Sequence, residues 1–311
     1  MDKKFIITVD TEGDNLWNWH EGEPIKTENT HFIPPFQDLC ENYGFIPTYL
    51  TNYEMALDEE WVKYGKTKAL SGKCEIGMHL HAWNTPPDYR LQKKSGGNAY
   101  ITEFPSEIME QKVVLLKKLL SDNFGLPITS NRSGRWATNS EYFQILKRSG
   151  ILVDCSVTPQ LDLSNNVGYS IDCGNDYRRV SYLPYEIVPG LLEVPMTTRR
   201  IHSPIGVTVK NRIRNVIKGK ELWLRPINAY DDIIRLVDIV ESKGDCDYLE
   251  FMIHSSELMP GGSPYFKDAR AVEEMYTDMN KLFSYLSKKG YVGIGLTEYG
   301  LLKSNATEMN R

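Results

Sequence analysis

The 311-residue sequence contains no apolar run that approaches the ~18 residues needed to cross a bilayer. The apolar run nearest the N-terminus, Phe5–Val9, is five residues long, whereas the core of a secretory signal spans ~7–15 residues. The sequence therefore predicts neither a transmembrane segment nor an export signal, and the cytoplasm is the expected compartment.

Cysteine is also scarce, and its spacing fits no common framework. The five cysteines are odd in number, widely separated and without a CxxC pair: Cys40, Cys74, Cys155, Cys173 and Cys246. This pattern argues against a disulfide-stapled fold and against a cysteine zinc site. Phosphate-binding loops of the GxxxxGKS/T and GxGxxG types are missing, and so is the GxSxG nucleophile elbow.

The sequence carries no basic excess. Lysine and arginine number 36 against 41 aspartates and glutamates, which gives a net charge of −5. Proteins that bind nucleic acids are usually basic, so a nucleic-acid partner is not expected. The densest basic stretch runs from Lys210 to Lys220 and includes Arg212, Arg214 and Lys218, and we interpret it as the solvated face of a helix.

What the sequence does contain is an alternation of short apolar runs and amphipathic helical patterns. Helical spacings of three and four recur in Met109–Leu120 and in Val272–Leu286, and Gly125 and Gly290 follow them as stop signals. Alternating strands and helices predict the α/β class, with a parallel sheet curled into a distorted (β/α) barrel of about seven strands. The seven strand candidates, each ending in polar residues, are Phe5–Val9, Phe45–Leu50, Cys74–Met78, Leu126–Thr129, Ile151–Val153, Tyr248–Ile253 and Val292–Leu296.

Two segments interrupt this alternation and are predicted to be lid-like insertions in a single domain. The first is a long loop with paired prolines and glycines, of the kind that covers or binds ligands. The second is rich in proline, tyrosine and arginine and contains a candidate hairpin, Tyr182–Val188 and Leu191–Met196. The predicted units are a barrel at 1–302, the inserted loop at 84–105, the insertion at 160–228 and a C-terminal tail at 303–311.

Polar residues follow two strand candidates in a pattern that indicates a metal site. Asp10 and Glu12 alternate after the first run, so their carboxylates face the same point beyond the strand. His79 and His81 have the same spacing after the third run. The carboxyl ends of parallel strands share one edge, where ligands bind in (β/α) folds. Two imidazoles with a carboxylate form a familiar divalent site with an open position for water.

Three further residues at strand ends are candidates for the same site. His254 follows a late run and could be a third ligand, a general acid or a buried structural histidine. Arg132 could hold a catalytic carboxylate ionised or bind an anionic substrate. Asp154 follows Ile151–Val153, and a carboxylate after so apolar a run is expected to meet an arginine or histidine of the site.

Candidate substrate-binding residues lie shortly after the strand ends. Trp83 and Trp136 could offer flat aromatic faces to the apolar faces of sugar rings. Arg135 lies beside Trp136 and is a candidate clamp for substrate. A carbohydrate is therefore the expected ligand, and the oligomeric state is left open.

Taken in chain order, these segments resemble the polysaccharide deacetylases of carbohydrate esterase family 4. More narrowly, the chain is similar to the branch found with bacterial O-antigen biosynthesis. The resemblance extends over nearly the whole chain and rests on short motifs at the strand ends. The six motifs are Thr8–Gly13, Phe45–Leu50, Glu75–His79, Arg132–Trp136, Val153–Pro159 and Ile253–His254.

The resemblance implies a distorted (β/α) barrel and a divalent metal ion, with zinc the expected ion. It also implies hydrolysis of an N-acetyl or O-acetyl group on a sugar, which can be lipid- or nucleotide-linked. By position, Asp10 would be the general base, Glu12 and His79 would be metal ligands, and His254 would be the general acid. Arg132 and Asp154 would tune Asp10 and His254.

Two features differ from the family pattern. Thr11 separates two acidic residues that are usually adjacent, so Glu12 takes the second role. The ligand histidines of the family usually lie four residues apart, but position 83 here is Trp83. The second histidine is His81, and a shifted pair can bind metal with a different geometry or mark a repurposed site.

Two other functions are compatible with the same residues. Asp10, Glu12, Asp154 and Glu257 could include a carboxylate pair for glycoside hydrolysis without a metal. A chain of this kind could also bind glycans without catalysis.

Overall fold

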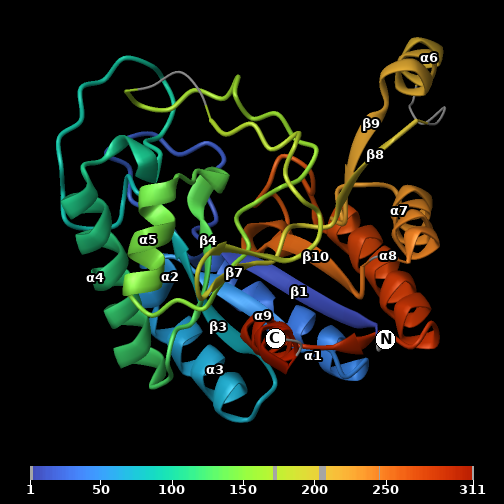
Figure 1. Cartoon of the computed structure of the whole chain (residues 1–311), viewed down its shortest axis with the longest axis horizontal. Helices are drawn as coiled ribbons and strands as arrows, with labels where there is room; N and C mark the ends of the chain where they lie inside the picture. Colours follow the sequence, from blue (N-terminus) through green and yellow to red (C-terminus); the bar gives the residue numbers. More distant parts are fainter. Residues whose placement is uncertain (1–2, 171–173, 203–207, 245, 310–311) are drawn as a thin grey trace.

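The computed structural model describes residues 3–170, 174–202, 208–244 and 246–309 (Figure 1). Its centre is a curled sheet of parallel strands, which confirms the predicted α/β class and the distorted (β/α) barrel. In order across the sheet, the seven parallel strands are β10 (Tyr248–His254), β1 (Lys4–Thr11), β2 (Pro47–Thr51), β3 (Glu75–Leu80), β4 (Ser130–Ser133), β5 (Val153–Asp154) and β7 (Leu191–Glu193). Two short strands are added to them: β6 (Tyr185–Val188), antiparallel to β7, and β11 (Val292–Gly293), beside the start of β1.

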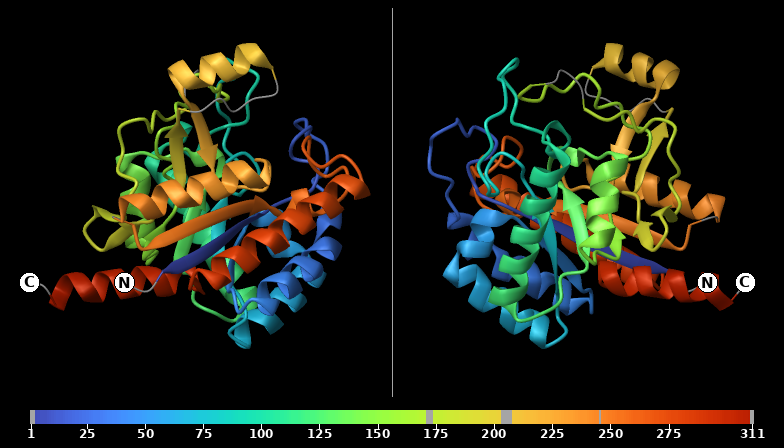
Figure 2. Two further views of the ribbon diagram at one scale, coloured as in Figure 1. Left: turned by 90° about the vertical axis from the view of Figure 1, so that its right-hand side faces the viewer. Right: turned by 60° about the vertical axis from the view of Figure 1, so that its left-hand side comes forward.

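Most helices alternate with these strands and pack around the outside of the sheet, whereas the C-terminal helix packs Leu296 and Tyr299 against Ile6, Leu50 and Val153 on the inner face (Figures 1 and 2). The Asn139 side chain accepts a hydrogen bond from the Tyr142 N–H and caps the start of one helix, and Gly125 ends another in the left-handed region with φ 70°. The helices of the barrel are α1 (Ile33–Asn42), α2 (Tyr53–Leu57), α3 (Glu59–Leu70), α4 (Ser106–Phe124), α5 (Ser140–Arg148), α7 (Tyr230–Lys243), α8 (Ala269–Lys288) and α9 (Leu296–Met309).

Aromatic side chains fill the contact between the sheet and α8. Phe5 of β1 meets Phe45 edge to face at 4.9 Å and Phe283 of α8 at 5.6 Å, measured between ring centroids. Phe251 of β10 lies 5.8 Å from Phe283 in the same arrangement. Burial of these rings fixes β1 and β10 side by side, and those two strands carry three of the candidate site residues at or just beyond their ends.

The segment that follows β7, the last parallel strand, contacts β10 at the opposite end of the parallel strands. The Glu250 N–H of β10 donates to the Thr197 hydroxyl at 2.9 Å, and the Tyr248 hydroxyl donates to the Pro195 carbonyl at 2.5 Å. No ladder joins β7 to β10 among the described strands, so the barrel is open here and only individual hydrogen bonds bridge the gap.

Two strand predictions differ from the structure. The run Leu126–Thr129 precedes the strand, and β4 begins at Ser130, since Pro127 has no N–H to contribute to a ladder. The run Val292–Leu296 gives only the two residues of β11 before α9 begins. The last parallel strand is instead β7, from the second half of the predicted hairpin, so the segment 160–228 contributes to the sheet itself.

The same segment forms an arm that projects from the barrel (Figure 2). Its two antiparallel strands are β8 (Thr198–Ile201) and β9 (Lys220–Trp223), and α6 (Val209–Lys218) lies at its tip. At the other end of the chain, α9 continues through residues 303–309, where the sequence predicted a tail.

Two predictions about missing features can be compared with the described residues. Within this part of the chain, no helix is both long and apolar enough to cross a membrane. The free cysteines there are Cys40, Cys74, Cys155 and Cys246. Cys173 lies outside the described residues.

Candidate active site

The parallel register brings the polar ends of β1, β3 and β10 together. Asp10 of β1 is the ladder partner of His254 of β10. His79 lies near the end of β3, and Glu12 and His81 directly follow β1 and β3. All five side chains are buried, so their charges and hydrogen bonds act with little screening by water.

Glu12, His79 and His81 place three donor atoms around one point. The Nε2 atoms of His79 and His81 lie 3.0 Å apart. Glu12 Oε2 is 3.0 Å from His81 Nε2 and 3.5 Å from His79 Nε2. Among the described residues, this is the group of histidine, cysteine and acidic side chains whose geometry could hold a metal ion.

The donor set fits a divalent ion. His79 Nδ1 lies 2.9 Å from the Arg132 carbonyl, which can only accept, so Nδ1 carries a proton and Nε2 is the atom that faces Glu12 and His81 and could bind a metal. Tetrahedral zinc with bonds of ~2.1 Å separates its ligands by about 3.4 Å. The observed separations of 3.0 to 3.5 Å bracket this value. Two imidazoles and one carboxylate leave a fourth position open.

Neighbouring groups hold these three candidate ligands in place. The Ser255 hydroxyl accepts from the Glu12 N–H at 3.0 Å, and the Asn29 amide donates to the Glu12 carbonyl at 2.7 Å. Gly134 packs directly against His81, where an added Cβ would lie 2.5 Å from His81 Cδ2. The glycine of the Arg132–Trp136 motif is therefore needed for the close approach of β4 to the second histidine.

Asp10 is held by a buried arginine. Arg132 Nη1 donates to Asp10 Oδ1 at 2.6 Å, and Arg132 Nη2 donates to Thr8 at 2.9 Å and to Glu250. Burial alone would raise the pKa of Asp10, but Arg132, with His79 and His254, more than offsets it and lowers that pKa. Asp10 is thus ionised at neutral pH, with Oδ2 facing His79 and His254 at 3.8 Å each.

Glu250 completes this network and should make stability depend on pH. Burial raises its pKa to about 7, although Arg132 and Thr8 favour the ionised form. The folded state therefore keeps a proton that the unfolded chain releases near its usual pKa of 4.5, so wild-type stability falls as the pH rises from 5 to 8. We expect Glu250→Gln to lose this dependence and to gain up to about 3 kcal/mol relative to wild type over that range. Urea unfolding of both proteins at several pH values measures this difference in stability. If the free energies of unfolding of the two proteins changed with pH in parallel, the prediction would be contradicted.

His254 lies between the ligands and a second ion pair. Its Nε2 is 3.8 Å from Asp10 Oδ2 and from Glu12 Oε1. Arg225 Nη2 donates to His254 Nδ1 at 3.0 Å and to Glu257 Oε1 at 2.9 Å. Because Arg225 can only donate, His254 carries its proton on Nε2, which is directed toward the site.

Asp154 does not join the site as the sequence predicted. Its carboxylate accepts from the Asn131 amide at 2.6 Å and the Ser156 hydroxyl at 3.0 Å, and no described bond links it to His254 or Arg132. Burial raises the pKa of Asp154 and that of Glu193 beside it, which favours protonation of this carboxyl pair. Hydrogen bonds from Asn131 and Ser156 take the place of the expected arginine or histidine partner. The residue beside His254 is Glu257 instead.

The predicted substrate-binding residues have different surroundings. The Trp83 ring stacks on His81, with centroids 4.3 Å apart and an interplanar angle of 21°. Arg135 instead donates to the Asn98 and Val167 carbonyls and lies over the Tyr100 ring, so it fastens the loop 84–105 rather than facing the ligands. Trp136 meets Trp223 of β9 edge to face at 5.3 Å.

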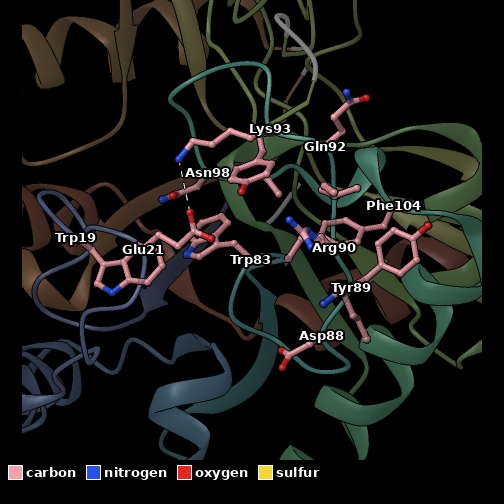
Figure 3. A pocket seen from close by; sticks show the side chains of 15 residues that line it. Trp19, Glu21, Trp83, Asp88, Tyr89, Arg90, Gln92, Lys93, Asn98 and Phe104 are labelled. Atoms are coloured by element: carbon pink, nitrogen blue, oxygen red, sulfur yellow. Dashed lines mark ion pairs between the residues drawn. The ribbon is translucent and has the colours of Figure 1, made fainter.

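Trp83 also lines a cavity of about 1000 Å³ beside the ligands (Figure 3). The predicted loop 84–105 supplies most of its wall, and Lys93 and Glu21 form an ion pair of 3.6 Å across it. Its aromatic lining consists of Trp19, Trp83, Tyr89, Phe104 and Tyr169.

Sequence reasoning missed the group that supports His254. Arg225 follows β9, in a stretch with no motif, so nothing in the sequence connected it with a histidine 29 positions later. Glu257 was considered only as a member of a carboxylate pair. Its spacing of three from His254 is typical of a capping box, in which the side chain accepts a hydrogen bond from the backbone N–H three residues earlier. Glu257 Oε2 does accept from the His254 N–H at 3.0 Å.

No protein-family model and no curated protein matches the sequence. Solved structures do match. A candidate polysaccharide deacetylase from Mycobacterium smegmatis superposes with a TM-score of 0.56 and 14% identity, covering 99% of this chain and 92% of that chain. A 4-alpha-glucanotransferase from Thermococcus litoralis has the same TM-score with 13% identity, covering 96% of this chain and 40% of the other. The first match confirms the resemblance at the level of the fold, and the second shows that the fold alone does not fix the reaction.

Proposed function

We propose that this chain, which has the fold of the polysaccharide deacetylases, is a metal-dependent hydrolase that removes an acetyl group from an N-acetylated or O-acetylated sugar. The observation that carries the proposal is the convergence of Glu12, His79 and His81 beside Asp10 and His254. A bound divalent ion, for which zinc fits the ligand set, would polarise an acyl carbonyl and lower the pKa of water.

Asp10 is proposed as the general base. Arg132 fixes Oδ1 and leaves Oδ2 directed toward the ligands. The lowered pKa keeps the carboxylate unprotonated at neutral pH, so it can accept the proton of an attacking water. Arg132 thus acts through Asp10, which it orients and keeps charged.

His254 is proposed to protonate the leaving amine or alkoxide from Nε2. Proton donation requires the imidazolium form, whose second proton on Nδ1 needs an acceptor. Glu257 Oε2 lies 3.7 Å from Nδ1 and can take this role once the Arg225 guanidinium turns away. The Arg225–Glu257 pair therefore sets which nitrogen of the imidazole is protonated.

The sugar is proposed to lie in the cavity against Trp83, whose stacking on His81 joins the aromatic wall to the metal ligands. A ring on that wall would carry its acetyl group toward Glu12, His79 and His81. Following the sequence resemblance, we place the substrate among the acetylated sugars of surface polysaccharides such as O-antigen.

The lowered pKa values of the carboxylates at the site argue against a metal-free glycosidase. Such an enzyme needs a carboxylic acid that stays protonated at neutral pH. Burial opposes ionisation of Glu12, but His254 and hydrogen bonds from His79 and His81 lower its pKa, and the pKa of Asp10 is lowered as well. Neither carboxylate at the site could therefore serve as the acid.

Metal content tests the proposal directly. We expect the purified protein, after reconstitution with zinc at neutral pH, to hold about one equivalent by plasma mass spectrometry. The variant His79→Ala/His81→Ala should hold less than a tenth of this, because a single carboxylate remains of the three donors. Removal of the metal with a chelator should abolish acetate release from acetylated sugars, and added zinc should restore it.

The matched control is His20→Ala/His31→Ala, which removes two exposed histidines outside the site and should keep the full equivalent. Absence of metal in the reconstituted wild type would contradict the proposal. Sugar binding without metal would then support a non-catalytic glycan-binding protein, and chelator-resistant glycan cleavage would support a glycosidase.

A further inference from the structure

Helix α6 presents its apolar residues to solvent rather than to the protein. Val209, Ile213, Val216 and Ile217 are 72%, 57%, 48% and 71% exposed, whereas Asn215 is 5% exposed. At about 100° per residue, the four apolar residues fall within an arc of about 100°, and Asn215 lies nearly opposite. A helix on the surface of a globular protein normally buries its apolar stripe. Helix α6 is therefore oriented with its apolar stripe toward solvent, the reverse of the usual arrangement.

Basic residues border this apolar stripe. Lys210, Arg214 and Lys218 recur every fourth position, which places them along one side of it. Within the described part of the chain, no acidic group lies within ion-pair distance of these three side chains. The solvated basic face that the sequence predicted is present, and it adjoins an exposed apolar stripe.

A hollow of about 500 Å³ lies between α6 and the strands β8 and β9. Glu221, the acidic residue in its lining, is already paired with Arg200. The hollow therefore keeps a positive charge suited to phosphate groups. Its lining residues are Arg200, Arg214, Asn215, Lys218, Gly219, Lys220 and Glu221.

The arm carries α6 clear of the barrel. Figures 1 and 2 show α6 at the tip of β8 and β9, on the same side of the molecule as the loop 84–105. That loop lines the cavity beside the candidate metal ligands. A flat surface that met α6 would thus lie on the side of the molecule where the site opens.

We propose that α6 docks on an anionic lipid membrane, with its apolar stripe at the boundary between headgroups and acyl chains and lipid phosphates in the basic hollow. Exposed apolar residues bordered by lysine and arginine are the pattern of helices that lie in the membrane interface. Pairing of two copies through this face would bring their unpaired cations together, which disfavours a second copy as the occupant. The proposal does not depend on the proposed function.

Co-sedimentation of the full chain with lipid vesicles tests the proposal. We expect binding to vesicles of phosphatidylcholine with 30% phosphatidylglycerol, at least tenfold weaker binding to phosphatidylcholine alone, and weaker binding as salt increases. Ile213→Ser/Ile217→Ser should reduce the affinity at least tenfold. Lys210→Gln/Arg214→Gln/Lys218→Gln should reduce it about 100-fold, because each cation near an anionic surface contributes about fivefold.

The control Leu70→Ser/Val114→Ser makes the same apolar change at exposed positions on α3 and α4 and should bind as wild type does. Circular dichroism and the oligomeric state by analytical ultracentrifugation accompany each variant. Failure of the wild type to bind anionic vesicles would overturn the proposal, and so would equal binding by all variants. A wild-type dimer that becomes monomeric with Ile213→Ser/Ile217→Ser, without vesicle binding, would identify the face as an interface between copies.

Discussion

Asp10→Asn should reduce acetate release from acetylated sugars by about 10²–10⁴-fold while leaving the fold and the bound metal intact. Asparagine keeps the shape of the side chain and an oxygen that can accept from Arg132, but it cannot take a proton. Asp10 lies beside the three converging donors rather than among them, since its Oδ2 is 3.8 Å from His79 Nε2. The loss should therefore appear in kcat, measured on a sugar that the wild type turns over.

Asp14→Asn is the matched control, because Asp14 is another buried carboxylate, in the turn beyond the end of β1, and is not among the converging atoms. We expect it to keep activity within about threefold. Metal content and thermal unfolding of both variants separate a chemical effect from a structural one. Full turnover by Asp10→Asn, or loss of its metal, would contradict the role of general base.

Local spacing was sufficient to predict that Glu12, His79 and His81 would lie together as candidate metal ligands. The alternation in Asp10–Glu12 and His79–His81 places each pair on one side of an extended segment, and the parallel sheet brings the two segments to the same edge. Both steps depend on backbone geometry that holds for any strand. For the same reason His254 could be expected at that edge before any contact was known.

Contacts between buried side chains were not predictable in this way. Asp154 was expected to meet a cation, but a second carboxyl, Glu193, reached it from β7, a strand that the sequence had assigned to an insertion. Arg135 was expected to bind substrate because it shares a motif with Arg132 and Trp136, yet its backbone is left-handed, with φ 57°, and its side chain donates to the Val167 carbonyl and to the loop. The spacing of residues along the chain does not show which strand will be the neighbour of another, nor where the backbone adopts a left-handed conformation.

A second network shows how the fold and the site depend on each other. Arg132 has no exposed surface, and its guanidinium joins β1 through Asp10 and Thr8 to β10 through Glu250. Its backbone carbonyl accepts from His79 and so sets the tautomer of a proposed metal ligand. Arg132 thereby contacts both the proposed general base, Asp10, and a proposed metal ligand, His79.

Arg132→Met should lower the free energy of unfolding by about 3–5 kcal/mol at pH 7, because it leaves the buried Asp10 carboxylate without a cation. A domain of ordinary stability has about 5–15 kcal/mol in total, so this is a large fraction. Methionine has a similar length and fills much of the space, which limits the cavity contribution. Urea unfolding followed by circular dichroism measures the difference, with the half-exposed Arg148→Met as the control, expected within about 1 kcal/mol of wild type.

The pH dependence distinguishes loss of charge pairing from loss of packing. In the wild type, Arg132 helps to lower the pKa of Asp10, so the stabilisation from that carboxylate is present above its unfolded pKa and is lost as the pH falls through the folded pKa. Without Arg132, the carboxyl can be protonated at a higher pH. The stability deficit of Arg132→Met should therefore be largest at neutral pH and become smaller toward pH 4. A deficit that stays constant from pH 7 to pH 4 would show that Arg132 stabilises the barrel by filling space and not by balancing the charge of Asp10.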